Sequence, residues 1–250
     1  MSLGDLDYAL SRVHARHGSR LTEGEWRHLE ASHDLASYLD AARTGALAPW
    51  VATLGVRADE HAIERALRME WRRYVQTVTL WHPSVWQPWL AWLAWLPWLA
   101  LLAQLARPEA PPLWLLADPV CGPVAPGTQA ERRAALERTV LAPLAAGLDR
   151  AHSPTVLWRR HWQELAPASD SDTQRLQQAL LATLARYAEA LALASTSDVP
   201  RAALASALRR LFRAASGTVV ATVCHLGLTG LDLQRLRGGL AYRCLAGGAF

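Results

Sequence analysis

The sequence contains no lysine, so all 26 of its basic side chains are arginine. A phosphate-binding loop of the G-x-x-x-x-G-K type requires a lysine, and so does an enzyme that forms a Schiff base with its substrate. A catalytic pair of serine and lysine is excluded for the same reason. The ordinary cause of such a bias is a GC-rich genome, so the absence of lysine narrows the possible functions without indicating one.

Cysteine is also scarce, because the chain has only Cys121, Cys224 and Cys244. An odd number of cysteines without a C-x-x-C pair argues against a disulfide framework and against a zinc site made of thiolates. The first ten residues, MSLGDLDYAL, carry acidic side chains where a signal peptide carries basic ones. We therefore expect a cytoplasmic protein, and we expect no cofactor.

Charged residues make up 19% of the chain and hydrophobic residues 51%, which is typical of a folded globular protein. The formal net charge is +4, and the surplus lies in residues 127–250, which have 15 arginines against 9 acidic residues. These arginines are spread along helical patterns and form no continuous basic run. The composition therefore does not favour nucleic acid as a partner.

The most unusual segment is residues 88–106, PWLAWLAWLPWLALLAQLA, in which the only strongly polar side chain is Gln104. Tryptophan recurs there every three residues, so on an α-helix the four indoles sweep about 180° of the surface. A helix that is apolar nearly all round is a core helix, a membrane segment or a partner-binding surface. Tryptophans in the middle of the stretch, together with Pro97, favour the core helix, because membrane tryptophans gather at the two interfaces.

The rest of the chain shows the three-and-four spacing of amphipathic helices and predicts an all-α fold, a multi-helix array of antiparallel helices. Residues 57–80 form one long helix, in which Arg68 belongs to the solvated face. Residues 128–150 form another, with Pro143 as a kink, and residues 169–194 form the longest.

The C-terminal part is less clear from its pattern. A helix is predicted from Ser197 to Ala215, the segment 219–228 reads as either a strand or a helix, and a last helix covers 231–245. Six prolines in residues 107–127 mark a linker packed on the body of the protein. We therefore predict an N-terminal helical unit (1–107), a Pro-rich packed linker (108–127) and a basic C-terminal helical unit (128–250).

Three groups of side chains could carry chemistry. A metal site would need three ligands from the set His14, His17, His28, Glu30 and His33. A thiol enzyme would need a histidine within hydrogen-bond reach of Cys224, and its neighbour His225 points elsewhere on regular backbone. Asp170 and Asp172 could bind a metal with a diphosphate, although an acidic residue at a helix start is first of all a cap. Solvated histidines on a helical protein are the simpler interpretation of the first group.

Arginines on helical faces are the candidates for partner binding: Arg159, Arg160, Arg209, Arg210, Arg213, Arg235 and Arg237. The first two lie beside Trp158 and Trp162, a combination that would also suit single-stranded nucleic acid. An amphipathic helix whose arginine stems cover apolar surface explains the same pattern.

Four segments carry a resemblance to a known family. They are DLDYALSRVHARHGSRL (5–21), LEASHDLASYLDAARTGALAPWV (29–51), IERALRMEWRRYVQTVTLWHP (63–83) with the Trp-rich helix after it, and LDLQRLRGGLAYRCLAG (231–247). Their order resembles the family of C-type (also called d-type) subunits of V-type and archaeal-type rotary ATPases. The chain departs from that family in its Trp-rich helix, where relatives carry polar side chains, and in its shorter length.

The resemblance implies a non-catalytic, all-helical, funnel-like protein that sits on the membrane rotor ring and receives the central stalk in proton or sodium transport. Its partners would be other ATPase subunits, and it would lie in the cytoplasm, peripheral to the inner membrane. The arginine patches would then meet an acidic stalk or the loops of the rotor ring. The alternative is a free-standing helical protein that binds a hydrophobic ligand or a membrane surface through its Trp-rich region.

Overall fold

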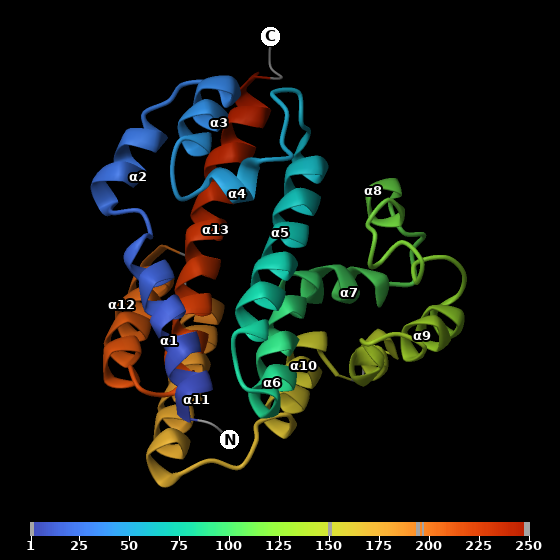
Figure 1. Cartoon of the computed structure of the whole chain (residues 1–250). Coiled ribbons are helices and arrows are strands. Elements are labelled where there is room, and N and C mark those ends of the chain that lie inside the picture. Colours follow the sequence, from blue (N-terminus) through green and yellow to red (C-terminus); the bar gives the residue numbers. More distant parts are fainter. Residues whose placement is uncertain (1–2, 150–151, 194–195, 197, 248–250) are drawn as a thin grey trace. The chain divides into compact units, whose positions relative to one another are not determined.

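The computed structural model describes residues 3–149, 152–193, 196 and 198–247, and every regular element in these ranges is a helix (Figure 1). The all-α class is therefore confirmed. The chain divides into two compact units, Met1–Gln87 with Ala168–Phe250 (unit 1) and Pro88–Pro167 (unit 2). The division differs from the predicted one, because the C-terminal helix packs on the N-terminal helices and both ends of the chain share one unit.

Unit 1 is organised around its last helix, which contacts helices from both ends of the chain. Its elements are α1 (Leu3–Gly18), α2 (Glu23–Glu30), α3 (Leu35–Arg43), α4 (Ala48–Val51), α5 (Glu60–Leu80), the 3₁₀-helix η1 (Ser84–Trp86), α11 (Ser171–Leu193), α12 (Asp198–Ala214) and α13 (Val219–Gly247). The helix α13 packs against α1, α3, α5, α11 and α12, and in Figure 1 it runs beside α1 and α5.

The segment 219–228, for which the sequence allowed either a strand or a helix, is the start of α13. This helix continues without a break through the predicted last helix. At 29 residues it is longer than the 23-residue α11, so the prediction that 169–194 is the longest helix was wrong. Every residue from Val219 to Leu226 is buried. Its β-branched residues lower helix propensity, but burial on all sides outweighs that small cost. The predicted cap Ser197 lies outside the described residues.

Side-chain caps mark the starts of helices in unit 1. Thr22 caps α2 with a full capping box, because its side chain accepts from the backbone N–H of Glu25 while the Glu25 carboxylate accepts from Thr22. Asp59 caps α5, so this helix begins at Glu60, three residues after the predicted start at residue 57. The prediction of a solvated Arg68 was wrong. It is buried, at 8% exposure, because the polar stripe of α5 is narrower than its sequence indicates.

Unit 2 consists of short helices connected by turns. They are α6 (Gln87–Ala91), the 3₁₀-helix η2 (Trp92–Trp98), α7 (Leu99–Leu105), α8 (Leu113–Leu116), α9 (Gln129–Glu137), the 3₁₀-helix η3 (Ala142–Asp149) and α10 (Pro154–Glu164). The predicted helix 128–150 is broken into α9 and η3, with the break before Pro143. Thr128 and Ser153 cap α9 and α10 as their sequences indicate.

The Trp-rich stretch is the core of unit 2, although it is not one α-helix. The backbone tightens from α-helix to 3₁₀-helix over η2 and returns to α-helix at Leu99. A 3₁₀-helix has three residues per turn, so a three-residue repeat keeps its members on one face. Pro97 has no N–H to donate and disfavours the α conformation in the residue before it, which accounts for the interruption.

Indoles from the Trp-rich stretch pack against those of α10. The rings of Trp89 and Trp162 stack at 5.0 Å, and Trp162 donates to the carbonyl of Trp89. Trp92 and Trp158 each donate an indole N–H to the other's backbone carbonyl, at 3.1 and 3.2 Å. Trp89, Trp92 and Trp98 are buried, which confirms the predicted core segment, whereas Trp95 is half-buried.

Ser84–Leu105 is the one helical stretch of the described residues that is long and apolar enough to cross a membrane. This statement rests on length and composition alone, and the core helix of a soluble protein meets the same criteria. Just over half of its most apolar window, 56%, is buried inside the protein.

Candidate functional site

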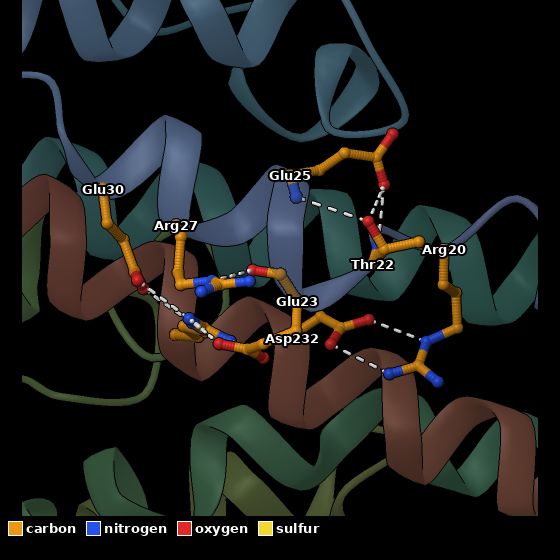
Figure 2. A network of polar contacts seen from close by, with 8 residues as sticks. Arg20, Thr22, Glu23, Glu25, Arg27, Glu30 and Asp232 are labelled. Carbon is orange, nitrogen blue, oxygen red and sulfur yellow. Dashed lines mark hydrogen bonds and ion pairs between the residues drawn. The ribbon is translucent and has the colours of Figure 1, made fainter.

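A network of polar contacts connects α13 to α2 and to the segment after α1 (Figure 2). Arg20, just after α1, donates two hydrogen bonds to the carboxylate of Asp232, at 2.7 and 2.9 Å. It also donates to the carbonyl of Leu228. Both partners of this ion pair are largely buried, with 15% and 20% of their side chains exposed. The pair therefore fixes the chain after α1 to the middle of α13.

One turn further along α13, Arg235 binds two carboxylates of α2. It donates to Glu30 at 2.6 and 2.8 Å and to Glu23 at 2.8 and 2.9 Å. Its guanidinium lies 4.9 Å from the ring centre of Trp26. The hydrogen bond from Arg235 lowers the pKa of Glu23 below its ordinary value. This predicted partner-binding residue is already engaged inside the protein.

The other predicted arginines differ in their surroundings. Arg237 forms an ion pair with Glu64 of α5, so it too has a partner within unit 1. Arg159 and Arg160 lie on α10 of unit 2, and both are exposed. The Nε atom of Arg160 is 3.7 Å from a carboxylate oxygen of Glu164, a loose contact at the surface.

Arg209, Arg210 and Arg213 make up the remaining basic group, here called the α12 arginine face. All three side chains are exposed, and none has a hydrogen bond or ion pair within the described residues. The opposite face of α12 buries Leu208 and Phe212. The amphipathic helix thus presents three exposed arginines, none of them in an ion pair within the described residues, over little more than one turn.

A cavity of about 230 Å³ lies within unit 1, beside the Arg20–Asp232 pair. Side chains of α1, α4, α5 and α13 line it, and the turn after α1 contributes as well. Its lining combines aromatic rings with polar groups: Arg16, Arg20, Trp50, Glu70, Arg73, Tyr74, Thr77, Trp81, His225 and Asp232 are among them. The sequence did not predict this cavity, because its lining comes from segments that lie far apart in the chain.

The lining of the cavity includes a partly buried hydrogen bond between Tyr74 and His225. The Tyr74 hydroxyl oxygen and Nε2 of His225 are 2.7 Å apart, and Nδ1 of His225 has no hydrogen-bond partner among the described residues. Burial lowers the pKa of His225 to about 3, and the positive charges of Arg20 and Arg16 add to the effect. Burial also raises the pKa of Tyr74 to about 12. Both groups are therefore neutral at physiological pH.

The histidines of α1 do not form a metal site with the other predicted ligands. His17 stacks on Phe212 at 3.9 Å, and His14 Nε2 lies 3.2 Å from the carbonyl of Ser216. His28 and His33 are exposed, and Glu30 binds Arg235. The described residues contain no group of three histidines, cysteines or acids that could hold a metal ion.

The remaining candidates for chemistry have structural partners. Cys224 is fully buried, and burial raises the pKa of its thiol to about 12, so it stays protonated. His225 faces Tyr74 through Nε2. Asp170 accepts hydrogen bonds from the N–H and the hydroxyl of Thr173, as a helix cap does. Asp172 pairs with Arg175 at 3.2 Å.

Comparison with known proteins adds no relative. No family model matches the chain, and no curated protein or solved structure matches it.

Proposed function

We propose that the chain is a non-catalytic coupling subunit of a bacterial V-type rotary ATPase, which links the central stalk to the membrane rotor ring. The observation that carries the proposal is the α12 arginine face, three exposed arginines on one helix that form no ion pair within the described residues. A basic helix face of this kind complements an acidic stalk or the loops of a rotor ring. The chain would then be cytoplasmic and would meet the inner membrane through its partners.

Two further features support this proposal. Four segments that resemble the C-type family of rotary ATPase subunits lie in unit 1 and contact each other through α13: 5–21, 29–51, 63–83 and 231–247. The Trp-rich stretch, which belongs to the same resemblance, lies in unit 2. The fold is entirely helical in the described residues, as the resemblance implies. A funnel-like arrangement of the helices belongs to the same proposal.

Affinity purification tests the proposal. A tagged chain is expressed in its source cells, and the proteins that co-purify from gently solubilised membranes are identified by mass spectrometry. We expect catalytic, stalk and rotor-ring subunits of a rotary ATPase. The variant Arg209→Glu, Arg210→Glu, Arg213→Glu should recover much less of them, because it places negative charge opposite an acidic partner.

A charge-matched control distinguishes an effect of the α12 arginine face from an effect of the net charge. Arg57, Arg107 and Arg138 are also exposed, and their side chains have no partner within the described residues. Reversing them to glutamate likewise changes the formal net charge from +4 to −2. If the unaltered chain recovers no ATPase subunit, the proposed function is wrong. If both triple variants recover the subunits equally, the assignment of the α12 face is wrong.

Binding of a hydrophobic ligand or a membrane surface through the Trp-rich region has less support. Trp92 and Trp98 are buried, and their indole N–H groups already bind Trp158 and Asp118. The indoles are thus used inside unit 2, and we do not propose this second function.

A further inference from the structure

The cavity of unit 1 has walls suited to a molecule that is part aromatic and part anionic. Its apolar side includes Trp50, which is almost buried, and the half-buried Trp81. The ring of Tyr74 lies 5.2 Å from that of Trp50, at an interplanar angle of 58°. Flat rings set at an angle in this way accept another aromatic ring edge to face.

Among the charged groups of the lining, only Arg16 has no charged partner within the described residues. Asp232 is held by Arg20, and Glu70 forms an ion pair with Arg73, so these four charges compensate one another. The side chain of Arg16 makes no hydrogen bond or ion pair within the described residues and reaches solvent at the edge of the cavity. The lining therefore carries one surplus positive charge.

The hydrogen bond between Tyr74 and His225 leaves a second donor available. When Tyr74 donates to Nε2, the proton of the neutral ring is on Nδ1, where it has no acceptor among the described residues. When Nε2 carries the proton and donates to Tyr74, the hydroxyl hydrogen of Tyr74 is free to donate into the cavity that it lines. Unpaired buried N–H groups are rarer than unsatisfied acceptors, so the second arrangement is favoured.

Volume limits what can fit between these groups. An apolar cavity of about 150 Å³ accommodates benzene. The present cavity has a volume of about 230 Å³, which leaves room for a carboxylate group beside one ring. A larger ligand, such as a nucleotide, exceeds this space.

We propose that this cavity binds a small aromatic monocarboxylate, with its ring between Trp50, Trp81 and Tyr74 and its carboxylate accepting from Arg16 and the Tyr74 hydroxyl. Both donors face the acceptor oxygens of one anionic group. The binding does not depend on assembly with an ATPase, because every residue involved belongs to unit 1.

Phenylacetate is the probe, and isothermal titration calorimetry on the full chain is the measurement. We expect binding in the millimolar range or tighter, much weaker binding of the neutral phenylacetamide, and no measurable binding of acetate, which lacks the ring. Saturation-transfer NMR should show that the ring protons of phenylacetate are in contact with the protein.

Two variants assign the carboxylate contacts. Arg16→Gln should weaken phenylacetate binding about tenfold, since it removes a charge-assisted hydrogen bond. Tyr74→Phe keeps the ring, removes the hydroxyl and should weaken binding several-fold. Arg57→Gln is the matched control, because this arginine is exposed and lies outside the lining, and it should leave the affinity unchanged.

Several outcomes would overturn the proposal. They are an absence of phenylacetate binding at millimolar concentrations, equal affinities for phenylacetate and phenylacetamide, equal binding of acetate, and unchanged affinity in Arg16→Gln. Circular dichroism of each variant confirms that it is folded. Arg16 is exposed, so its substitution provides the decisive result even if Tyr74→Phe perturbs the core.

Discussion

Trp92 and Trp95 offer a matched test of how unit 2 is built, because they are identical residues one 3₁₀ turn apart on the same segment. We predict that Trp92→Ala strongly destabilises unit 2, whereas Trp95→Ala has a much smaller effect. The reason is burial, since Trp92 is 5% exposed while Trp95 is half-buried. A membrane-facing or partner-facing stretch would not distinguish the two in this way.

The magnitude follows from the contacts of each indole. Replacing a buried tryptophan by alanine costs about 3–5 kcal/mol. The Trp92 variant also leaves the carbonyl of Trp158 without its indole donor, which adds about 1 kcal/mol. The reciprocal bond from Trp158 to the Trp92 carbonyl is retained, because that acceptor is backbone. The total of about 4–6 kcal/mol approaches the whole stability of a small domain.

The loss in Trp95→Ala is smaller. A half-buried indole loses about half of the transfer free energy, roughly 1–2 kcal/mol. Its edge contact with Trp98, at 5.7 Å between ring centres, adds less than about 1 kcal/mol. Urea unfolding followed by far-ultraviolet circular dichroism measures both changes. Equal shifts of the unfolding midpoint, or no shift in Trp92→Ala, would refute the assignment of this segment as a buried core.

Features that depend on neighbouring residues could be predicted from the sequence. The capping box at Thr22 needs only Glu25 three residues later, and the start of α10 needs only Ser153 before Pro154. Such signals act within one turn, so no knowledge of the fold is required. The all-α class follows from the same local periodicity.

Pairing between distant residues could not be predicted. Arg235 reads as an exposed basic residue in its own helix, yet its acceptors Glu23 and Glu30 lie more than 200 residues earlier. Tyr74 and His225 are 151 residues apart and meet only because α5 packs on α13. One signal of this pair was present in the sequence, because His225 lies inside the apolar segment 219–228. A buried polar side chain needs a hydrogen-bond partner, but the sequence does not identify that partner.

Two further predictions concern α13. Burial gives His225 a pKa of about 3 against an ordinary 6.5, so the unfolded chain binds the proton more tightly than the folded chain. Stability is therefore full above about pH 6.5, and this group alone should lower it by about 2 kcal/mol between pH 7 and pH 5. Burial also lowers the pKa of His82 and of the less buried His17, so both add to the loss, which urea titration at each pH measures. Gly239→Ala should destabilise unit 1, because the new Cβ would lie 2.3 Å from the Tyr38 hydroxyl. In Gly238→Ala the new Cβ meets nothing within 4 Å, so this variant should stabilise α13 by about 0.5–1 kcal/mol. If the thermal midpoints of the two variants move in the same direction, the packing described for this helix is wrong.

The three-residue spacing of the tryptophans carries more structural information than their hydrophobicity. On an α-helix it spreads the indoles around half the circumference, a pattern that would require burial on many sides at once. On the 3₁₀-helix η2 the same spacing keeps Trp92, Trp95 and Trp98 on one side, so a single neighbouring layer can cover them. Trp158 and Asp118 provide acceptors for two of these indoles. The repeat is therefore a property of the local helix type, and it need not reflect a membrane or an external partner.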